Sequence, residues 1–275
     1  MGMLDNKVAI LTGSGRGIGA AAAKLFASEG AKVVVSDLDA APAEETAAAI
    51  RNAGGTAIVV AGDVTSPDFP AQLIKSTLDA FGGLDIIVNN AGYTWDAVIQ
   101  NMTDKQWYAI LDVHVTAPFR ILREASHYIR DAAKKEIAAN GRANPRKVVN
   151  VSSVSGVYGN AGQANYSTAK AGITGLTKTL AKEWGRYNVQ VNAVCYGFID
   201  TRLTASKENA EKMQREGEEI QLGIPDQMRQ MSSMLIPLGR PGTPEEAAGP
   251  MLFLASPLSN YVSGAVLEVT GGRAL

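Results

Sequence analysis

The sequence is poor in the side chains on which several kinds of chemistry depend. It contains one cysteine, Cys195, and two histidines, His114 and His127, in 275 residues. One cysteine excludes an internal disulfide framework and gives no metal cluster. Two histidines leave little for zinc chemistry or a serine–histidine triad. We therefore expect no metal, and we expect the acid or base of any enzyme built on this chain to be another residue type.

Neither sign of charge dominates, and no long apolar run occurs. The 26 basic and 27 acidic side chains give a net charge of −1, which argues against nucleic acid or an anionic membrane as partner. No apolar run reaches the roughly 18–20 residues of a membrane span. Residues 1–7 lack a secretory signal, and Asn6 stands where a myristoylation motif requires Ser or Thr. These absences predict a cytoplasmic protein.

Glycine, by contrast, is frequent, with 28 residues, and short β-branched runs alternate with helix-like segments. Continuous apolar runs are typical of strands buried on both faces, and strand–helix alternation predicts a parallel sheet covered on both sides. The expected strands are Val8–Thr12, Val33–Asp37, Ala57–Ala61, Ile86–Asn89, Val148–Val151, Val189–Val194 and Ala265–Val269. The expected helices are Gly17–Ser28, Pro42–Asn52, Ala71–Phe81, Asp104–Ala139, Ala164–Arg186 and Pro244–Ala255. We expect one Rossmann-type, doubly wound α/β domain over residues 1–275.

Two segments depart from this alternation. Residues 126–147 are rich in Lys and Arg, which indicates a solvated face or a docking surface for an acidic carrier protein or for coenzyme A phosphates. Residues 203–235 form a long connection that is first charged and then methionine-rich. Long connections in compact domains are often functional, so this one is expected to be a substrate lid; ordinary amphipathic packing is the alternative.

A glycine-rich turn follows the first expected strand and opens the first expected helix. Glycine permits a tight strand-to-helix turn and lets a pyrophosphate approach the backbone, while the helix N-terminus offers N–H groups to its phosphates. The candidate cofactor residues of this turn are Gly13, Arg16, Gly17, Ile18 and Gly19.

Asp37 closes the second expected strand, 18 residues beyond Gly19. A carboxylate there accepts hydrogen bonds from the adenosine ribose and repels a 2′-phosphate, which favours NAD over NADP. Alternatively, Asp37 or Asp39 caps the next helix, and Arg16 serves a 2′-phosphate. Asp63, which precedes Val64 at the end of the third strand, is a candidate for the adenine amino group or a helix cap.

A second constellation lies after the fifth expected strand. Tyr166 and Lys170 are four residues apart and share one face of a helix. An ammonium near a phenol lowers the tyrosine pKa, so that Tyr166 can exchange a proton near neutral pH. Ser153, at the strand end, can polarise the carbonyl oxygen of a substrate with which Tyr166 exchanges the proton.

These motifs together resemble the classical short-chain dehydrogenases/reductases over essentially the whole chain. The matching motifs are Thr12-Gly13-x-x-x-Gly17-x-Gly19, Asn89-Asn90-Ala91-Gly92, Ser153, Tyr166-x-x-x-Lys170 and Gly197-Phe198-Ile199-Asp200-Thr201. The resemblance implies a sheet of about seven strands and hydride transfer between nicotinamide and a carbonyl or alcohol carbon. It implies Tyr166 as acid/base, Ser153 as donor to the substrate oxygen, and Lys170 as ligand of the nicotinamide ribose. It also implies that the cofactor is lined by Asn90, Ala91, Gly92, Tyr166, Lys170, Ile199 and Thr201.

Two positions depart from the family pattern. His114 stands where the family usually has an asparagine whose backbone carbonyl holds a proton-relaying water. The carbonyl of His114 can still hold this water, and the imidazole either joins the relay as a catalytic group or is a satisfied buried histidine; a weakened relay is the alternative. Tyr196 stands where proline is usual before Gly197, and we expect its ring to lie close to nicotinamide and substrate.

The segment from Gly159 to Tyr166 resembles the 3-oxoacyl thioester reductases most, so a 3-oxoacyl or 3-hydroxyacyl thioester is the expected substrate. A cyclic alcohol, steroid or polyol dehydrogenase is the alternative, and a non-catalytic dinucleotide-binding regulator is a third. The resemblance also implies a homodimer or homotetramer.

Overall fold

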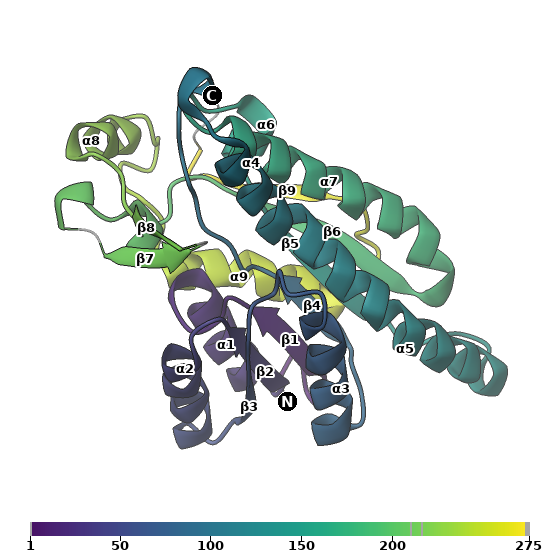
Figure 1. Cartoon of the computed structure of the whole chain (residues 1–275). Coiled ribbons are helices and arrows are strands. Elements are labelled where there is room, and N and C mark those ends of the chain that lie inside the picture. The colour runs from purple at the N-terminus through teal and green to yellow at the C-terminus, as the bar shows by residue number, and fades with distance from the viewer. Residues whose placement is uncertain (1, 210, 216, 273–275) are drawn as a thin grey trace.

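A computed structural model of the chain describes residues 2–209, 211–215 and 217–272. Its centre is a parallel seven-stranded sheet with the strand order β3-β2-β1-β4-β5-β6-β9, covered by helices on both faces (Figure 1). The strands are β1 Val8–Thr12, β2 Lys32–Asp37, β3 Thr56–Ala61, β4 Ile86–Asn89, β5 Arg146–Ser153, β6 Val189–Tyr196 and β9 Val266–Val269. The expected doubly wound sheet is confirmed.

The helices divide into two layers. The helices α1 Gly17–Ser28, α2 Ala40–Asn52 and α9 Pro244–Ala255 pack on one face of the sheet, and α3 Phe69–Phe81, α5 Ala117–Asn140 and α7 Ala164–Trp184 pack on the other. Successive strand residues enter opposite cores: Leu11 faces the first layer and Ile10 the second. Two hydrophobic cores therefore hold the sheet rigid between the layers.

The strand order changes direction between β1 and β4, because the chain builds outward from β1 to β3 and then crosses back. In open parallel sheets, ligands bind at the carboxyl ends of the strands beside such a reversal. The glycine-rich turn after β1 and the asparagine motif after β4 meet there.

The single long helix expected over 104–139 is interrupted. It consists of α4 Asp104–Leu111, a π-helical turn Asp112–Thr116, and α5. Pro118 has no N–H, so it cannot donate to the carbonyl of His114 four residues before it, and the helical ladder is broken at that point.

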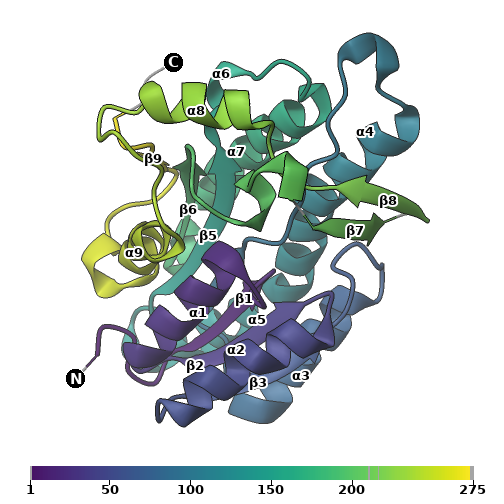
Figure 2. The ribbon, with the colours of Figure 1, turned by 90° about the vertical axis from the view of Figure 1, so that its left-hand side faces the viewer.

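The 203–235 excursion contains structure that the sequence pattern did not predict. It forms an antiparallel hairpin, β7 Lys212–Arg215 with β8 Glu218–Gln221, followed by α8 Asp226–Met234. Figure 2 shows the hairpin between α4 and the α1–α2 side of the molecule. A short helix, α6 Val154–Tyr158, also follows β5. Among the described residues, no helix combines the length and apolarity that crossing a membrane requires.

Candidate active site

The glycine-rich turn leaves the start of α1 open to a ligand. Gly13 and Gly17 have φ values of +61° and +54°, and a Cβ on Gly19 would lie 2.2 Å from the carbonyl oxygen of Gly13. The backbone N–H groups of the first turn of α1 have no side-chain cap. A dinucleotide pyrophosphate fits this cradle, since it supplies the acceptors that these N–H groups lack.

Asn90 fixes the turn from the neighbouring strand. Its side-chain amide donates to the carbonyls of Thr12 and Gly13, at 3.0 and 2.9 Å. The hydroxyl of Thr12 in turn accepts the backbone N–H groups of Asn90 and Ala91, both at 3.1 Å. The two motifs thus hold each other in place, a role that goes beyond the cofactor contact expected for Asn90.

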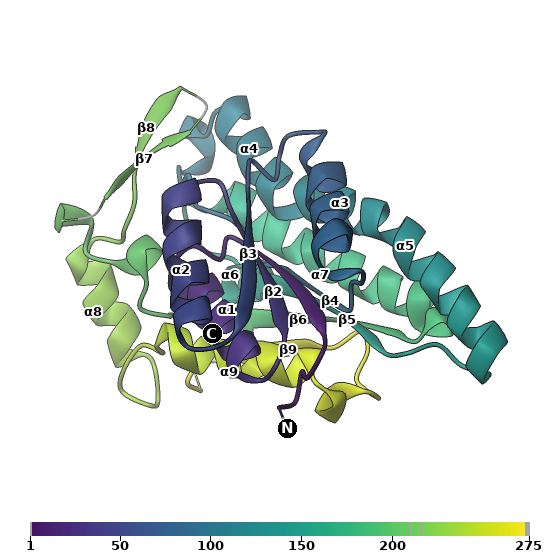
Figure 3. The same cartoon turned by 90° about the horizontal axis from the view of Figure 1, so that it is seen from below.

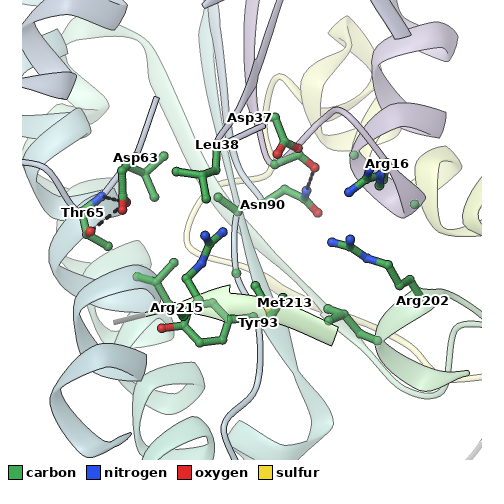
Figure 4. Close-up of a pocket in the computed structure, with 18 of the residues that line it drawn as sticks. Arg16, Asp37, Leu38, Asp63, Thr65, Asn90, Tyr93, Arg202, Met213 and Arg215 are labelled. Carbon is green, nitrogen blue, oxygen red and sulfur yellow. Dashed lines mark hydrogen bonds between the residues drawn. The ribbon is translucent and has the colours of Figure 1, made fainter. Parts of the chain in front are cut away.

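A cavity extends from this turn along the carboxyl edge of the sheet (Figure 4). It is lined by the predicted cofactor residues Gly13, Arg16, Gly17, Ile18, Gly19, Asp37, Asp63, Val64, Asn90, Ala91, Gly92 and Thr201. It is also lined by residues that the sequence did not single out, among them Leu38, Tyr93, Val113, Arg202, Leu203, Met213 and Arg215. Several of these come from the excursion, which was expected to be a substrate lid but whose charged, weakly periodic sequence did not indicate which of its residues would line this cavity.

Among the predicted cofactor residues, Tyr166 and Lys170 do not line this cavity, and neither does Ile199. The side chain of Ile199 is buried in the hydrophobic core. The Cδ1 atom instead packs against Gly242, where it lies 2.7 Å from the position of a Cβ. The contact with the cofactor that the resemblance implies for Ile199 can therefore be made only by its backbone.

The acidic residues at the strand ends make local contacts. Asp37 accepts the backbone N–H of Gly15 at 2.9 Å and that of Asp39 at 3.3 Å, and Arg16 pairs with Asp39 at 3.5 Å. Neither Asp37 nor Asp39 caps α2 through its side chain. Asp63 accepts from the N–H and hydroxyl of Thr65, at 2.9 and 2.7 Å, in place of the helix cap that was the alternative.

Ser153, Tyr166 and Lys170 converge at the end of β5. Ser153 and Tyr166 share a hydrogen bond, and the Lys170 ammonium lies 5.5 Å from the centre of the Tyr166 ring. The Lys170 Nζ also donates to the carbonyl of Val151 at 2.7 Å. These residues do not line the cavity described above; Leu203 and Met213 of the excursion pack into the same core cluster as Tyr166.

The expectation of a lowered pKa for Tyr166 was wrong. Burial raises the pKa of Tyr166 to about 12, and the hydrogen bond with Ser153 opposes that rise only in part. Burial also lowers the pKa of Lys170 to about 7. Desolvation of both groups therefore outweighs the attraction between ammonium and phenolate.

His114 lies in the π-helical turn and is buried. Its Nε2 is 2.8 Å from the carbonyl oxygen of Tyr93, which can only accept, so Nε2 carries the proton. The imidazole meets the Tyr166 ring edge-on, with 5.1 Å between ring centres, and its Nδ1 is buried without a hydrogen-bond partner among the described residues. Burial, with the nearby Lys170, lowers the pKa of His114 well below its ordinary value. The imidazole is therefore neutral.

Tyr196 does not lie beside the nicotinamide region, contrary to the expectation. Its ring is buried in the core beneath α9, and its hydroxyl donates to the carbonyl of Ala247. Side chains alternate along β6, so Tyr196 shares the α9 face with Val194, whereas Cys195 faces Lys170.

The basic 126–147 stretch has exposed side chains, Arg130, Lys134, Lys135 and Arg142, as a solvated face requires. The α5 helix, 24 residues or about 36 Å long, runs from the carboxyl edge of the sheet to the amino edge (Figure 3). Arg146 and Lys147, the first residues of β5, are buried, and Arg146 is paired with Glu136 at 2.6 Å. The stretch thus lies mainly at the end of the domain away from the site.

Comparison with known proteins agrees with this geometry. Residues 13–274 match the family model described as enoyl-(acyl carrier protein) reductase. The chain is 37% identical over 269 residues to a 3-oxoacyl-[acyl-carrier-protein] reductase of Thermotoga maritima, covering 98% of each chain. It is 38% identical over 270 residues to the enzyme of the same description from Vibrio cholerae, again covering 98% of each.

A solved structure gives the same result. A short-chain type dehydrogenase/reductase from Mycobacterium marinum superposes with a TM-score of 0.82 at 28% identity, covering 98% of this chain and 96% of that one. The matched length, the sheet order and the nucleotide cradle agree with one another. The chain therefore belongs to the short-chain dehydrogenase/reductase family, whose members are oxidoreductases that bind a nicotinamide dinucleotide.

Proposed function

We propose that this chain is an NAD(H)-dependent oxidoreductase acting on a 3-oxoacyl or 3-hydroxyacyl thioester. The observation that carries the proposal is the convergence of Ser153, Tyr166 and Lys170 at the carboxyl end of β5. The descriptions of the Thermotoga and Vibrio relatives support the thioester as substrate. When bound, the dinucleotide supplies or accepts the hydride.

The side chains have separable tasks in this proposal. Ser153 and Tyr166 hydrogen-bond the substrate oxygen together, and Tyr166 gives its proton to that oxygen on reduction or takes it back on oxidation. A pKa of about 12 keeps Tyr166 protonated and ready to donate at neutral pH. Lys170 holds the nicotinamide ribose and, when charged, favours the phenolate that remains.

His114 acts in this proposal through its backbone. Pro118 cannot provide the α-helical donor to the His114 carbonyl, so in this proposal that carbonyl of the π-helical turn accepts from a relaying water. The neutral imidazole packs on Tyr166 and fixes Tyr93. The alternative is a direct catalytic role through the unpartnered Nδ1.

The preference for NAD depends on Asp37. Its carboxylate is fixed by the N–H groups of Gly15 and Asp39 at the edge of the cavity, where it can accept from a ribose but repels a 2′-phosphate. Arg16 is already paired with Asp39, which reduces its availability to a 2′-phosphate.

Self-association also forms part of the proposal. Tyr108 on α4 and Phe119 on α5 are exposed large side chains of the kind that dimer interfaces bury. Sedimentation at several concentrations tests it, and a monomer at micromolar concentration contradicts it.

The experiment is a turnover screen in which the absorbance of the reduced cofactor is monitored. Acetoacetyl thioester is compared with a panel of cyclic ketones, each with NADH and NADPH, for the unaltered chain and for Tyr166→Phe. We expect thioester reduction with NADH, lost in Tyr166→Phe and retained in the control Tyr158→Phe, whose hydroxyl contacts Glu268 at the surface. Turnover of cyclic ketones alone contradicts the substrate, and no turnover at all favours a regulator.

A further inference from the structure

The β7–β8 hairpin brings two kinds of side chain to opposite faces. Met213 and Arg215, two residues apart, line the cavity, whereas Lys212 points outward and pairs with Glu219 at 2.6 Å. This alternation is the ordinary consequence of strand geometry. One face of β7 is therefore part of the dinucleotide cavity.

Arg215 carries a charge that the described residues of its own hairpin do not neutralise. Its cross-strand neighbour is Glu218, but the Glu218 carboxylate pairs at 2.7 Å with Lys105 on α4. The Arg215 guanidinium instead lies 5.6 Å from the centre of the Tyr93 ring and donates to the carbonyl of Gln214. Within residues 2–209, 211–215 and 217–272, no carboxylate forms an ion pair with it.

Arg202, the residue directly before the excursion, also lines this cavity. It follows Thr201, whose methyl group lies 3.8 Å from the position of a Cβ on Gly17, next to the uncapped start of α1. Its guanidinium pairs with the largely exposed Glu211 at 3.2 Å. In Figure 4 the guanidinium groups of Arg202 and Arg215 both point into the cavity.

Two guanidinium groups that face an uncapped helix N-terminus across a cavity form a site for a polyanion. Each can donate two parallel hydrogen bonds to phosphate oxygens, and the partly enclosed position strengthens those bonds. We propose that Arg202 and Arg215 bind the pyrophosphate of the dinucleotide from the side opposite α1, so that the bound cofactor holds the hairpin closed. The proposal rests on the family's dinucleotide binding and is independent of the NAD preference and of the thioester substrate.

Binding measurements without substrate test this. The dissociation constant of NADH is measured by its fluorescence for the unaltered protein, Arg215→Met, Arg202→Met and the matched control Lys212→Met. We expect each arginine variant to weaken NADH about tenfold or more, because a charge-assisted bond is lost. The Lys212→Met variant stays within about twofold of the unaltered protein, because its charge faces away from the cavity.

Two further readouts separate phosphate contact from a structural role. The loss in Arg215→Met should shrink as salt is raised, since salt screens the lost interaction, and ADP-ribose should show the same loss as NADH. In a protease digest cutting after Glu218 and Glu219, saturating NADH should protect the unaltered hairpin and the Lys212→Met hairpin, but not the Arg215→Met hairpin.

The contrary outcomes are equally distinct. Unchanged or tighter NADH binding in Arg215→Met would overturn the proposal, since the Arg215 side chain would then either contribute nothing to NADH affinity or obstruct NADH binding. A loss confined to NADPH would assign the arginines to a 2′-phosphate, and a loss independent of salt would mark a structural role; either result overturns it too. Failure of the thioester to react leaves these binding results unaffected.

Discussion

Gly92 and His114 are packed so closely that Gly92 cannot gain a side chain while the imidazole stays in place. A Cβ on Gly92 would lie 2.0 Å from Cε1 and 2.7 Å from Nδ1 of His114, far inside van der Waals contact. The imidazole cannot slide aside freely, because Nε2 bonds the Tyr93 carbonyl at 2.8 Å and the ring abuts Tyr166. In Gly92→Ala the ring must therefore move and give up that hydrogen bond.

The cost follows from those two losses. Overpacking a dense site costs about 1–3 kcal/mol, and a broken hydrogen bond about 1 kcal/mol. We expect Gly92→Ala to lower the free energy of unfolding by about 2–4 kcal/mol. In a His114→Ala background the obstacle is absent, and the same change should cost less than about 0.5 kcal/mol or stabilise slightly by restricting the unfolded chain.

Urea unfolding at one fixed protein concentration measures this coupling. The four proteins compared are the unaltered chain, Gly92→Ala, His114→Ala and the double variant. Gly175→Ala is the matched control, because a Cβ there has no atom within 4 Å and replaces glycine inside α7. It should stabilise the fold by up to about 1 kcal/mol. Equal penalties for Gly92→Ala in both backgrounds would refute the contact between Gly92 and the imidazole as the cause.

Three further outcomes are expected. Asp37→Ala should weaken NADH and narrow the difference between NADH and NADPH affinities in a binding titration; tighter NADPH binding by the unaltered protein contradicts the role given to Asp37. His114→Asn should keep activity within about threefold if the relay runs through the backbone, whereas a tenfold loss, about 1.4 kcal/mol in barrier, gives the imidazole a direct role. Lys147 is buried with Ser259 as hydrogen-bond partner, and burial lowers its pKa to about 8, so the unfolded chain binds the extra proton between pH 8 and 10.5. Stability should therefore rise with pH across that window, Lys147→Met should stabilise the fold at pH 7, and its advantage in thermal unfolding should disappear near pH 10.5.

The sheet could be predicted from the sequence because each strand is buried on both faces. Apolar residues dominate the predicted strands, for example Val33–Asp37 and Ile86–Asn89. The ends of the predicted strands differ from those of the observed strands by at most two residues. The nucleotide turn was equally accessible, because its chemistry is local: the glycines, the strand before them and the helix after them are contiguous in sequence.

The remaining features depend on contacts between distant segments. Nothing in 212–221 alternates strongly enough to announce a strand pair, and the positions of Arg202 and Arg215 follow from how the excursion folds back over α1. The placement of Tyr196, in contrast, was accessible from parity: it lies two residues after Val194 and so shares the face that α9 covers. Likewise, a helix after β4 must run back to the amino edge before β5 begins, which fixes where the basic stretch lies.

Tyr93, directly after the Asn89-Asn90-Ala91-Gly92 motif, contacts both His114 and the β7–β8 hairpin. Its carbonyl accepts from His114, which packs on Tyr166, while its ring carries the Arg215 guanidinium. A displacement of the hairpin therefore acts on the residue that fixes His114 beside the proposed proton donor. If phosphate draws Arg215 away from the Tyr93 ring, only the contact with that ring is lost. The hydrogen bond between the Tyr93 carbonyl and His114 does not involve the ring and is kept. The Arg215 contact and the setting of Tyr166 thus meet at one residue but at separate atoms of it, so we expect Arg215→Met to leave the hydrogen bond between Tyr93 and His114 intact.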